Sequence, residues 1–326
     1  MSAAASPAAA FSIPPTAPAR ARYRGRFAPS PTGPLHFGSL VAALASYCDA
    51  RAAQGEWLLR IEDVDLPRSR PGAEGQILSA LERHGFAWDG PVTRQSQRTP
   101  LYDAALAKLK ATGLAYACAC SRRELESAPL GVGGERVYPG TCRAGSPLSH
   151  HDRRQHAWRV RVGNADVESH DRLQVAQRQS MATDVGDFVL QRADGLFAYQ
   201  LAVTVDDADQ GITDIVRGAD LLASTPRQVL LQRLLDLPVP DYLHVPIAIN
   251  GAGEKLSKQT HAAPLPATPL PTLLAAWDFL GQAPFPERPE SVAEFWAWTR
   301  ETWRVSRVPP VLMLPAPPDM NAGERA

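Results

Sequence analysis

The sequence predicts an α/β fold built on a parallel sheet that helices cover on both faces. Two observations favour this class. Strand-like and helix-like segments alternate over residues 22–114, and Gly or Pro residues separate them. In a sheet of this kind, ligands bind at the carboxyl ends of the strands. The chain has 326 residues, which suffices for one large domain or two modest domains with a substantial core.

The first half of the chain contains two predicted strands and three predicted helices. The strands are YRGRFAPS, which ends in a turn, and EWLLRIEDVD. Apolar residues at helical spacing predict the helices, and Gly85 and Gly113 are expected to end the second and third of them. The helices are expected over residues 38–54, 71–85 and 101–113.

The residue pattern changes at the start of the second half of the chain. Residues 115–156 look loop-like, and AWRVRV at residues 157–162 reads as a strand. Residues 187–222 read as β-rich, with a hairpin turn at ADG.

A further helix is expected over residues 224–237. Ser224 or Thr225 would cap it, and Pro226 would stand at its first position. Beyond Gln259 the chain is Pro-rich, but four tryptophans there argue against complete disorder.

Composition argues against several classes of protein. Lys and Arg, 34 in total, balance 34 Asp and Glu, so nucleic-acid binding would depend on a local patch. No run of apolar residues is long enough for a membrane span, and four cysteines do not suggest a secreted disulfide framework. Residues 1–20 are Ala- and Pro-rich and are expected to be a disordered tail, with a transit peptide as the alternative. We therefore expect a cytoplasmic protein that does not bind membranes.

The segment RFAPSPTGPLHFGS, residues 26–39, joins a predicted strand to a predicted helix. Unpaired backbone N–H groups and the helix dipole attract anions at such a point. Gly38 permits close backbone approach, Ser39 can cap the helix, and His36 adds a donor that can become cationic. The pattern fits a polyphosphate site. The alternative interpretation is a structural turn between strand and helix in which His36 binds no ligand.

A second segment, GAGEKLSKQT at residues 251–260, lies in a predicted loop. Lys255 and Lys258 are three residues apart and can clamp a pyrophosphate as charge develops on it. A solvated basic loop is the alternative interpretation of this pair.

Three of the four cysteines are close together in the loop-like region. Cys118, Cys120 and Cys142 suggest Zn²⁺, which prefers four thiolate or imidazole ligands in a tetrahedron. Three unrelated, reduced cysteines are the alternative. The candidates by position for a fourth ligand are Tyr138, His150 and His151.

Taken together, these segments resemble the glutamyl subgroup of the class I aminoacyl-tRNA synthetases. PLHFGS is similar to the HIGH signature of that family and KLSKQ to its KMSKS loop. RIEDVD and FAYQLAVTVDDADQGITDIVRGADLL also match, in the same order, and the likeness covers residues 22–260. Ser39 stands where the signature has its second His, and Gln259 where the loop has its last Ser. Since His36 and Lys258 are kept, neither departure puts adenylation in doubt.

The resemblance implies that the protein activates glutamate with ATP and Mg²⁺ to form glutamyl-adenylate. His36 and Lys258 would stabilise the pentavalent phosphate and the departing pyrophosphate. The family does not use paired general acid and base carboxylates, so Asp206 and Asp207 are expected in a solvated turn. The implied ATP contacts are Pro29, His36, Gly38, Ser39, Lys255 and Lys258.

The same resemblance implies a glutamate site with two cations and one anion, which complements the charges of glutamate. Arg26, assisted by Tyr199, would bind the side-chain carboxylate. Arg217 would bind a carboxylate bidentately, and Glu62 would hold the ammonium group. The implied contacts are Arg26, Phe27, Ala28, Pro29, Ser30, Glu62, Tyr199 and Arg217.

Within this subgroup, the C-x-C and Y-x-x-x-C pattern resembles short proteins that attach glutamate to queuosine at the wobble position of tRNA(Asp). This implies a monomer whose partners are ATP, L-glutamate and the anticodon stem-loop of queuosine-containing tRNA(Asp). A truncated synthetase that charges tRNA(Glu) is the alternative. The implied ligands of one structural Zn²⁺ are Cys118, Cys120, Tyr138 and Cys142.

The resemblance also implies a Rossmann-like catalytic domain that a zinc-binding insertion divides. The residues after Gln259 are expected to form a short helical region that contacts the tRNA stem, without an anticodon-binding domain. The expected divisions are the tail at 1–20, the catalytic halves at 21–114 and 157–260, the insertion at 115–156, and the C-terminal region at 261–326.

Overall fold

The computed structural model describes residues 22–145, 155–257 and 262–320 of the chain. The tail expected over residues 1–20 lies outside the described residues, as does Lys258. In the described ranges, none of the helices has the length and apolar character needed to cross a membrane.

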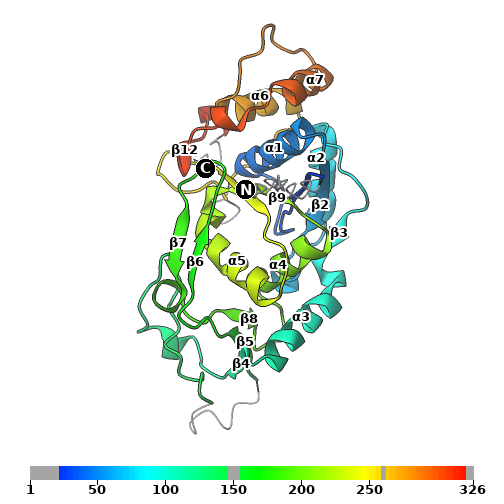
Figure 1. The fold of residues 1–326 in the computed structure, drawn as a ribbon. Coiled ribbons are helices and arrows are strands. Elements are labelled where there is room, and N and C mark those ends of the chain that lie inside the picture. The colour runs from blue at the N-terminus through cyan, green and yellow to red at the C-terminus, as the bar shows by residue number, and fades with distance from the viewer. Residues whose placement is uncertain (1–21, 146–154, 258–261, 321–326) are drawn as a thin grey trace, which may run out of the picture.

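Parallel strands lie at the centre of the molecule (Figure 1), and the predicted parallel sheet is confirmed. They are β1 (Arg24–Phe27), β2 (Glu56–Ile61), β3 (Thr93–Arg94), β9 (Asp214–Gly218) and β10 (Asp241–Val245). β2 pairs with both β1 and β3, and β9 pairs with β10. The Thr213 N–H donates to the Arg24 carbonyl at 3.0 Å, so β9 lies beside β1.

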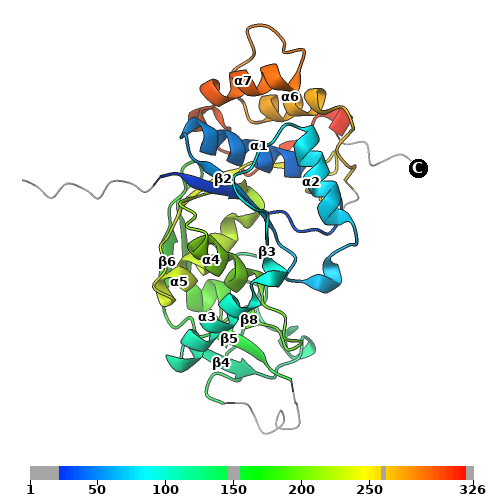
Figure 2. The same ribbon diagram turned by 90° about the vertical axis from the view of Figure 1, so that its right-hand side faces the viewer.

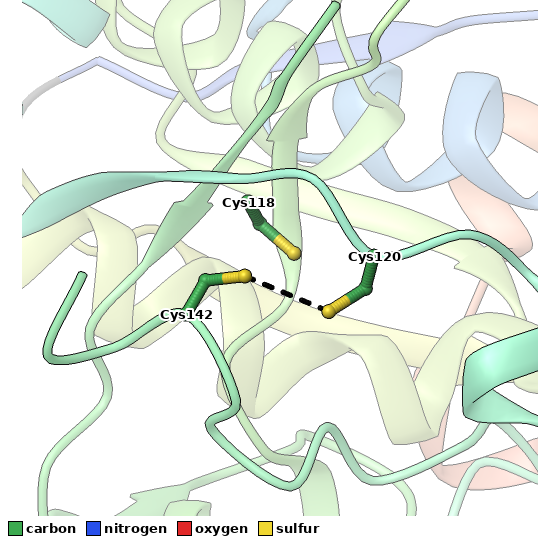
Figure 3. A group of neighbouring side chains, drawn as sticks. All are labelled: Cys118, Cys120 and Cys142. Atoms are coloured by element: carbon green, nitrogen blue, oxygen red, sulfur yellow. Dashed lines mark hydrogen bonds between the residues drawn. The ribbon is translucent and has the colours of Figure 1, made fainter. Parts of the chain in front are cut away.

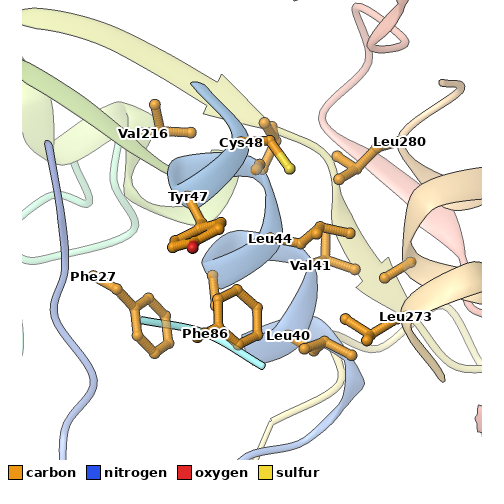
Figure 4. Packing of buried hydrophobic residues seen from close by; sticks show 14 of the residues in the cluster. Phe27, Leu40, Val41, Leu44, Tyr47, Cys48, Phe86, Val216, Leu273 and Leu280 are labelled. Atoms are coloured by element: carbon orange, nitrogen blue, oxygen red, sulfur yellow. The ribbon is translucent and has the colours of Figure 1, made fainter. Parts of the chain in front are cut away.

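Helices cover both faces of these strands (Figure 1). The helices in the described part of the chain are α1 (Phe37–Ala52), α2 (Ala73–Arg83), α3 (Thr99–Ala111), α4 (Tyr199–Asp209), α5 (Thr225–Leu234), α6 (Pro269–Phe279) and α7 (Val292–Thr302), of which α6 and α7 pack on α1 and α3 packs on α4. The three helices predicted in the first half correspond to α1, α2 and α3. Alternate residues of a strand face opposite sides, so Val216 enters the core around α1 and Ile215 the core around α4. In Figure 4, Val41 and Leu44 of α1 lie toward Leu273 of α6.

Antiparallel strands lie at the end of the molecule opposite α6 and α7 (Figure 2). They are β4 (Ala115–Cys118), β5 (Ala157–Val160) and β8 (Val189–Gln191), with β5 in the middle. Because β4 pairs with β5, the two ends of the predicted insertion meet there. The remaining strands are the hairpin β6 (Asp166–Ser169) and β7 (Gln177–Ser180), and the parallel pair β11 (Ile247–Ile249) and β12 (Met313–Pro315). Short 3₁₀ helices span Leu66–Arg68, Gln95–Gln97, Arg123–Leu125, Ala219–Ser224, Val305–Arg307 and Pro318–Met320, and Met181–Val185 forms a π-helical turn.

The expectation of a β-rich segment over residues 187–222 is wrong for its centre. β8 and the hairpin turn at ADG are present, since Gln191 and Phe197 form an antiparallel bridge. After that turn, residues 199–209 form the helix α4 instead of a strand. The β-branched run VTV favours a strand locally, but tertiary packing overrides such weak propensities.

Ser224 occupies the N-cap position of α5, as predicted, but it does not cap the helix with its side chain. It already has helical backbone angles, and its side chain makes no capping hydrogen bond. Its hydroxyl oxygen accepts instead from Gln200 Nε2 at 3.2 Å. Thr225 is the first helical residue, and Pro226 follows it.

The aromatic C-terminal region packs on α1 and α2, so the argument against complete disorder is confirmed there. Trp277 is fully buried, and the indole N–H of Trp296 donates to the His84 carbonyl at 2.9 Å. Gly85 ends α2 with a φ of +75°, and a Cβ at this position would lie 2.6 Å from Trp296 Nε1. Both the left-handed backbone and the close indole therefore require glycine.

Asp49 links α1 to three distant segments. Its buried carboxylate accepts from the Tyr23 hydroxyl at 2.6 Å, from Trp303 Nε1 at 3.1 Å, and from both terminal nitrogens of Arg172 at 2.6 and 3.0 Å. Removing this acceptor would leave several poorly solvated donors without a partner.

We expect Asp49→Ala to lower the free energy of unfolding by about 2 to 4 kcal/mol, because it removes the buried acceptor of several hydrogen bonds and of an ion pair whose Arg172 side chain is 33% exposed. Urea denaturation measures this value. The matched control is Asp166→Ala, which removes a pair with Arg178 whose side chains are 54% and 72% exposed. That change should cost less than about 1 kcal/mol, and equal losses in both variants would contradict the role of Asp49.

Candidate active site

A cleft of about 1160 Å³ opens at the carboxyl ends of β1, β2 and β9. This is the position that the sequence predicts for a ligand in a parallel sheet. With Lys258 outside the described residues, every other residue implied to contact glutamate or ATP lines this cleft. These residues are Arg26, Phe27, Ala28, Pro29, Ser30, His36, Gly38, Ser39, Glu62, Tyr199, Arg217 and Lys255.

His36 lies where the cleft meets the N-terminus of α1. It is the N-cap residue of that helix, and its Nδ1 accepts from the Ser39 backbone N–H at 3.3 Å. The expectation that Ser39 caps the helix is therefore wrong, because Ser39 supplies the N–H that is capped. Since Nδ1 acts as the acceptor, the proton of the neutral ring is on Nε2. His36 can thus present an N–H donor to an anion.

Gly38 lies close to the His36 ring at the same point. A Cβ there would lie 3.3 Å from His36 Nδ1 and 3.5 Å from the Leu256 carbonyl oxygen. A Cβ would crowd the His36 ring, which would have to shift slightly, and would make only an ordinary contact with the loop that holds Leu256. Glycine therefore leaves the His36 ring undisturbed at the start of α1.

Lys255 lies in this loop and pairs with the carboxylate of Asp220, which also lines the cleft. Asp220 was not predicted from the sequence, because nothing in the residues that follow β9 indicates that one of them pairs with Lys255. The pair fixes Lys255 beside the cleft. A polyphosphate would compete with Asp220 for its ammonium group.

Arg26 lies in the floor of the cleft and is only 4% exposed. Its Nε and Nη2 donate to the two carboxylate oxygens of Asp207 at 3.0 and 3.2 Å. Arg60 also donates to Asp207, at 2.8 Å. Although burial opposes ionisation, Arg26 and Arg60 hold the pKa of Asp207 below its usual value.

The expectation that Asp206 and Asp207 lie in a solvated turn is therefore wrong. Both are buried in α4, and Asp206 accepts from Arg98 Nε at 2.6 Å and from the Tyr102 hydroxyl at 2.8 Å. Through these contacts, the two carboxylates of α4 bind arginine side chains beneath the cleft. Asp207 fixes Arg26 and leaves its Nη1 for a ligand.

Glu62 follows β2 directly and adds a carboxyl group, whose side chain is 10% exposed, to the same end of the cleft. Its backbone N–H donates to the Pro29 carbonyl at 3.0 Å, which joins the ends of β1 and β2. Burial raises the pKa of its carboxyl to about 7, although Arg60 Nη2, 3.7 Å away, opposes the rise. At neutral pH, Glu62 is therefore partly protonated before a cation binds.

This pKa predicts a pH dependence for any ligand whose ammonium group Glu62 holds. Only the ionised carboxylate attracts the ammonium, so binding weakens as pH falls through about 7. We expect the KM for glutamate at pH 6 to be roughly tenfold its value at pH 8, since a group one unit below its pKa is about 90% protonated.

Steady-state kinetics between pH 6 and 8 measure this effect. Glu62→Gln is the matched control, because it should raise the KM at all pH values and abolish the dependence. A KM for glutamate that does not change with pH in the unmodified protein would exclude the role of Glu62.

Arg217 enters the cleft from β9. Its Nε donates to His244 Nε2 at 3.0 Å and its Nη2 to the Thr225 hydroxyl at 2.9 Å. Its Nη1 is buried and has no hydrogen-bond partner in the described part of the chain. His244 in turn contacts Asp171, with 2.6 Å between Nδ1 and Oδ2. Asp171 and His244 were not predicted from the sequence, since Asp171 lies in an unpatterned loop and His244 in the strand β10.

Tyr199 is the first residue of α4 and lines the cleft. Burial raises the pKa of its phenol, so the hydroxyl stays protonated at neutral pH. It can therefore donate a hydrogen bond to a carboxylate. Arg68 and Arg70, which the sequence analysis did not single out, also line the cleft.

A separate cluster of thiols lies at the base of the predicted insertion. The Sγ atoms of Cys118, Cys120 and Cys142 lie within 4.8 Å of one another (Figure 3). Tyr138 Oη lies 3.3 Å from Cys118 Sγ and 3.4 Å from Cys120 Sγ. The other candidates by position, His150 and His151, fall outside the ranges that the structure describes.

The chemistry of this donor set fits a soft divalent cation. Burial raises the pKa of Cys120 to about 12 and that of Tyr138 above its usual value. Without a cation, these groups therefore keep their protons. A bound cation would displace them.

Comparisons with known proteins are consistent with a catalytic role for the cleft. Residues 22–267 match the catalytic domain of the class I tRNA synthetases for glutamate and glutamine. The chain is 56% identical over 297 residues to a glutamyl-Q tRNA(Asp) synthetase of Thiobacillus denitrificans, over 90% of this chain and 98% of that protein. It is 54% identical over 305 residues to a protein of the same name from Aromatoleum aromaticum, over 93% and 96% of the two chains.

Among solved structures, a glutamate-tRNA synthetase of Elizabethkingia anophelis superposes with a TM-score of 0.75 at 26% identity. The match covers 92% of this chain and 69% of that one. A glutamate tRNA ligase of Elizabethkingia meningosepticum, solved in complex with its amino acid, gives a TM-score of 0.74 at the same identity.

Proposed function

The chain belongs to the class I tRNA synthetases for glutamate and glutamine, and we propose that it glutamylates queuosine in tRNA(Asp). It is a ligase that activates glutamate with ATP and Mg²⁺ to glutamyl-adenylate and then transfers the glutamyl group. The observation that carries the proposal is one cleft that combines paired arginines and a glutamate with a helix N-terminus suited to phosphate. The relatives named for this reaction share more than half of their residues with the chain.

We assign the glutamate end of the cleft to three charged residues. Arg26 and Arg217 would neutralise the two carboxylates, and Glu62 would hold the ammonium group. The two arginine side chains and the Glu62 backbone are fixed before the ligand arrives, since Asp207 holds Arg26, His244 and Thr225 hold Arg217, and the Pro29 carbonyl holds the Glu62 N–H. Such preorganisation brings the reacting carboxylate to the α-phosphate without further ordering. Phe27, Ala28, Pro29, Ser30 and Tyr199 would complete the enclosure.

We assign the other end of the cleft to ATP. The N–H at His36 Nε2 would stabilise the charge that develops on the phosphate during attack. Lys255 and Lys258 would stabilise the departing pyrophosphate. Pro29, Gly38 and Ser39 would line the nucleotide. Mg²⁺ bound with ATP would neutralise part of the phosphate charge.

Pyrophosphate exchange into ATP tests the activation step. We expect the exchange to depend on glutamate, with little activity for glutamine or aspartate. Glutamine lacks the carboxylate for which the second arginine is placed, and a site built for that charge rejects the neutral analogue strongly. Exchange that does not depend on glutamate would refute the proposal.

We further propose one structural Zn²⁺ held by Cys118, Cys120, Cys142 and Tyr138. The sulfur cluster and the phenol oxygen beside it support this assignment. The ion would cross-link β4 to the loop that carries Cys142. The chain would act as a monomer in the cytoplasm, with catalytic halves at 21–114 and 157–260 on either side of the zinc-binding insertion at 115–156.

Cys120→Ser should lose the bound Zn²⁺, because serine replaces a thiolate with a poor ligand. Elemental analysis of the purified protein measures the zinc content, which should fall from about one ion per chain to near zero. The matched control is Cys48→Ser, since Cys48 is buried in α1 away from the cluster. Unchanged zinc in Cys120→Ser would rule out the site.

A further inference from the structure

We propose that Asp171 and His244 are positioning residues that hold Arg217 so that its Nη1 faces the bound carboxylate. This inference rests on the proposed function, because it assumes that Arg217 binds glutamate. It concerns residues that lie behind Arg217 and do not line the cleft themselves.

The contacts form one chain from a loop to the cleft. Asp171 lies in the loop between β6 and β7, His244 lies in β10, and Arg217 lies in the neighbouring strand β9. His244 is 0% exposed, and the Asp171 side chain is 2% exposed. The two distances are 2.6 Å from Asp171 Oδ2 to His244 Nδ1 and 3.0 Å from His244 Nε2 to Arg217 Nε.

The contacts also fix the tautomer of His244. A guanidinium N–H can only donate, so His244 Nε2 must accept. The ring proton is then on Nδ1, from which it is donated to the Asp171 carboxylate. Burial and the charge of Arg217 lower the pKa of His244 to about 4, although Asp171 opposes the shift, so the ring is neutral.

Asp171 is held in one orientation. Its Oδ1 accepts from the backbone N–H groups of Leu173 and Gln174 at 2.9 and 2.8 Å. Oδ1 also accepts from the His244 backbone N–H at 3.4 Å, so Oδ2 is the oxygen left for the His244 ring. An anion fixed in this way selects the tautomer that accepts from Arg217.

The remaining contacts determine which nitrogen of the Arg217 guanidinium is left for the ligand carboxylate. Nε is held by His244, and Nη2 is held by Thr225 at 2.9 Å. Nη1 is the buried nitrogen with no hydrogen-bond partner among the residues that the structure describes. A ligand carboxylate would supply the acceptor that Nη1 lacks, which requires the groups that cover this buried nitrogen to move aside when the ligand binds. The bidentate contact expected for Arg217 would also need Nη2 to leave Thr225.

The substitution Asp171→Asn distinguishes a role of Asp171 in positioning Arg217 from a role in packing. The two backbone N–H groups require the amide oxygen at the Oδ1 position, so the amide NH₂ must face His244. The ring would then accept at Nδ1 and carry its proton on Nε2, against the Nε–H of Arg217. The N–H groups at His244 Nε2 and Arg217 Nε would then point toward each other. Arg217 would therefore shift, although the volume of the side chain at position 171 is almost unchanged.

Pyrophosphate exchange with glutamate, together with thermal unfolding, tests the inference. We expect Asp171→Asn to raise the KM for glutamate about 10- to 100-fold, the range for loss of one hydrogen bond to a charged group. The KM for ATP should change less than about twofold, and the variant should stay folded, with a Tm lowered by the two opposed buried donors. His244→Asn should have the same effect, whereas His244→Gln should retain most of the affinity, because its amide oxygen can reach the position of Nε2.

Asp166→Asn is the matched control, since Asp166 lies in the same hairpin but in an exposed pair with Arg178. Its kinetics should be unchanged. An unaltered KM for glutamate in Asp171→Asn would overturn the inference and leave the proposed function intact. Equal rises in both KM values would also overturn it, in favour of a purely structural role. If the unmodified protein shows no glutamate-dependent exchange, the proposed function fails, and the inference fails with it.

Discussion

His36→Asn is expected to lower the rate of glutamate-dependent pyrophosphate exchange by about 100- to 1000-fold, the usual loss for one donor that stabilises transition-state charge. Asparagine is among the best N-cap residues, so its side-chain oxygen can replace His36 Nδ1 as the acceptor for Ser39. It has no counterpart of the Nε2–H. The variant therefore removes the donor at the phosphate end of the cleft and keeps the start of α1.

Two measurements separate the chemical role of His36 from its structural role. The Tm of His36→Asn should be close to that of the unmodified protein, whereas His36→Ala loses the cap as well and should be less stable by about 1 kcal/mol. Both variants should retain the KM for glutamate. Near-normal exchange in His36→Asn would show that His36 serves only to cap α1.

Arg26→Ala should raise the KM for glutamate by about 100-fold or more, with a change of less than about threefold in the KM for ATP. The reason is that the variant removes a desolvated, charge-assisted contact to one carboxylate of the ligand. Exchange kinetics with each substrate varied in turn measure the two constants. The effect should be confined to glutamate because Arg26 lies with Asp207 at the glutamate end of the cleft.

Arg26→Lys is the matched variant for this prediction. It keeps a cation beside Asp207, so the fold should be retained, but it lacks the planar fork that contacts both oxygens of Asp207. We expect an intermediate KM for glutamate. If Arg26→Ala affects the constants for ATP and glutamate equally, Arg26 is not a glutamate contact.

The order of short motifs allowed much of the cleft to be predicted from the sequence. Arg26 and Glu62 adjoin the ends of predicted strands, and His36 precedes a predicted helix. Parallel strands bring their carboxyl ends to one edge, so these residues meet in space although they are distant in the chain. The likeness to a known family supplied the glutamate-binding roles of Arg26, Glu62, Arg217 and Tyr199, for which the local sequence carries no independent signal.

The groups that hold these side chains could not be predicted in the same way. Asp207 looked like part of a polar turn, because DDADQG contains the residues typical of turns. Its burial depends on Arg26 and Arg60, which are far away in the sequence. His244 and Asp171 are also joined by tertiary contact alone. Pairing of buried charges is a property of the fold, and no local pattern encodes it.

Transfer of labelled glutamate to purified tRNAs tests the central claim most directly. The three acceptors are tRNA(Glu), tRNA(Asp) with queuosine, and the same tRNA(Asp) without it. The proposed function predicts label on the queuosine-containing tRNA(Asp) and none on the other two. Label on tRNA(Glu) would contradict it and would identify the chain as a synthetase that charges tRNA for protein synthesis.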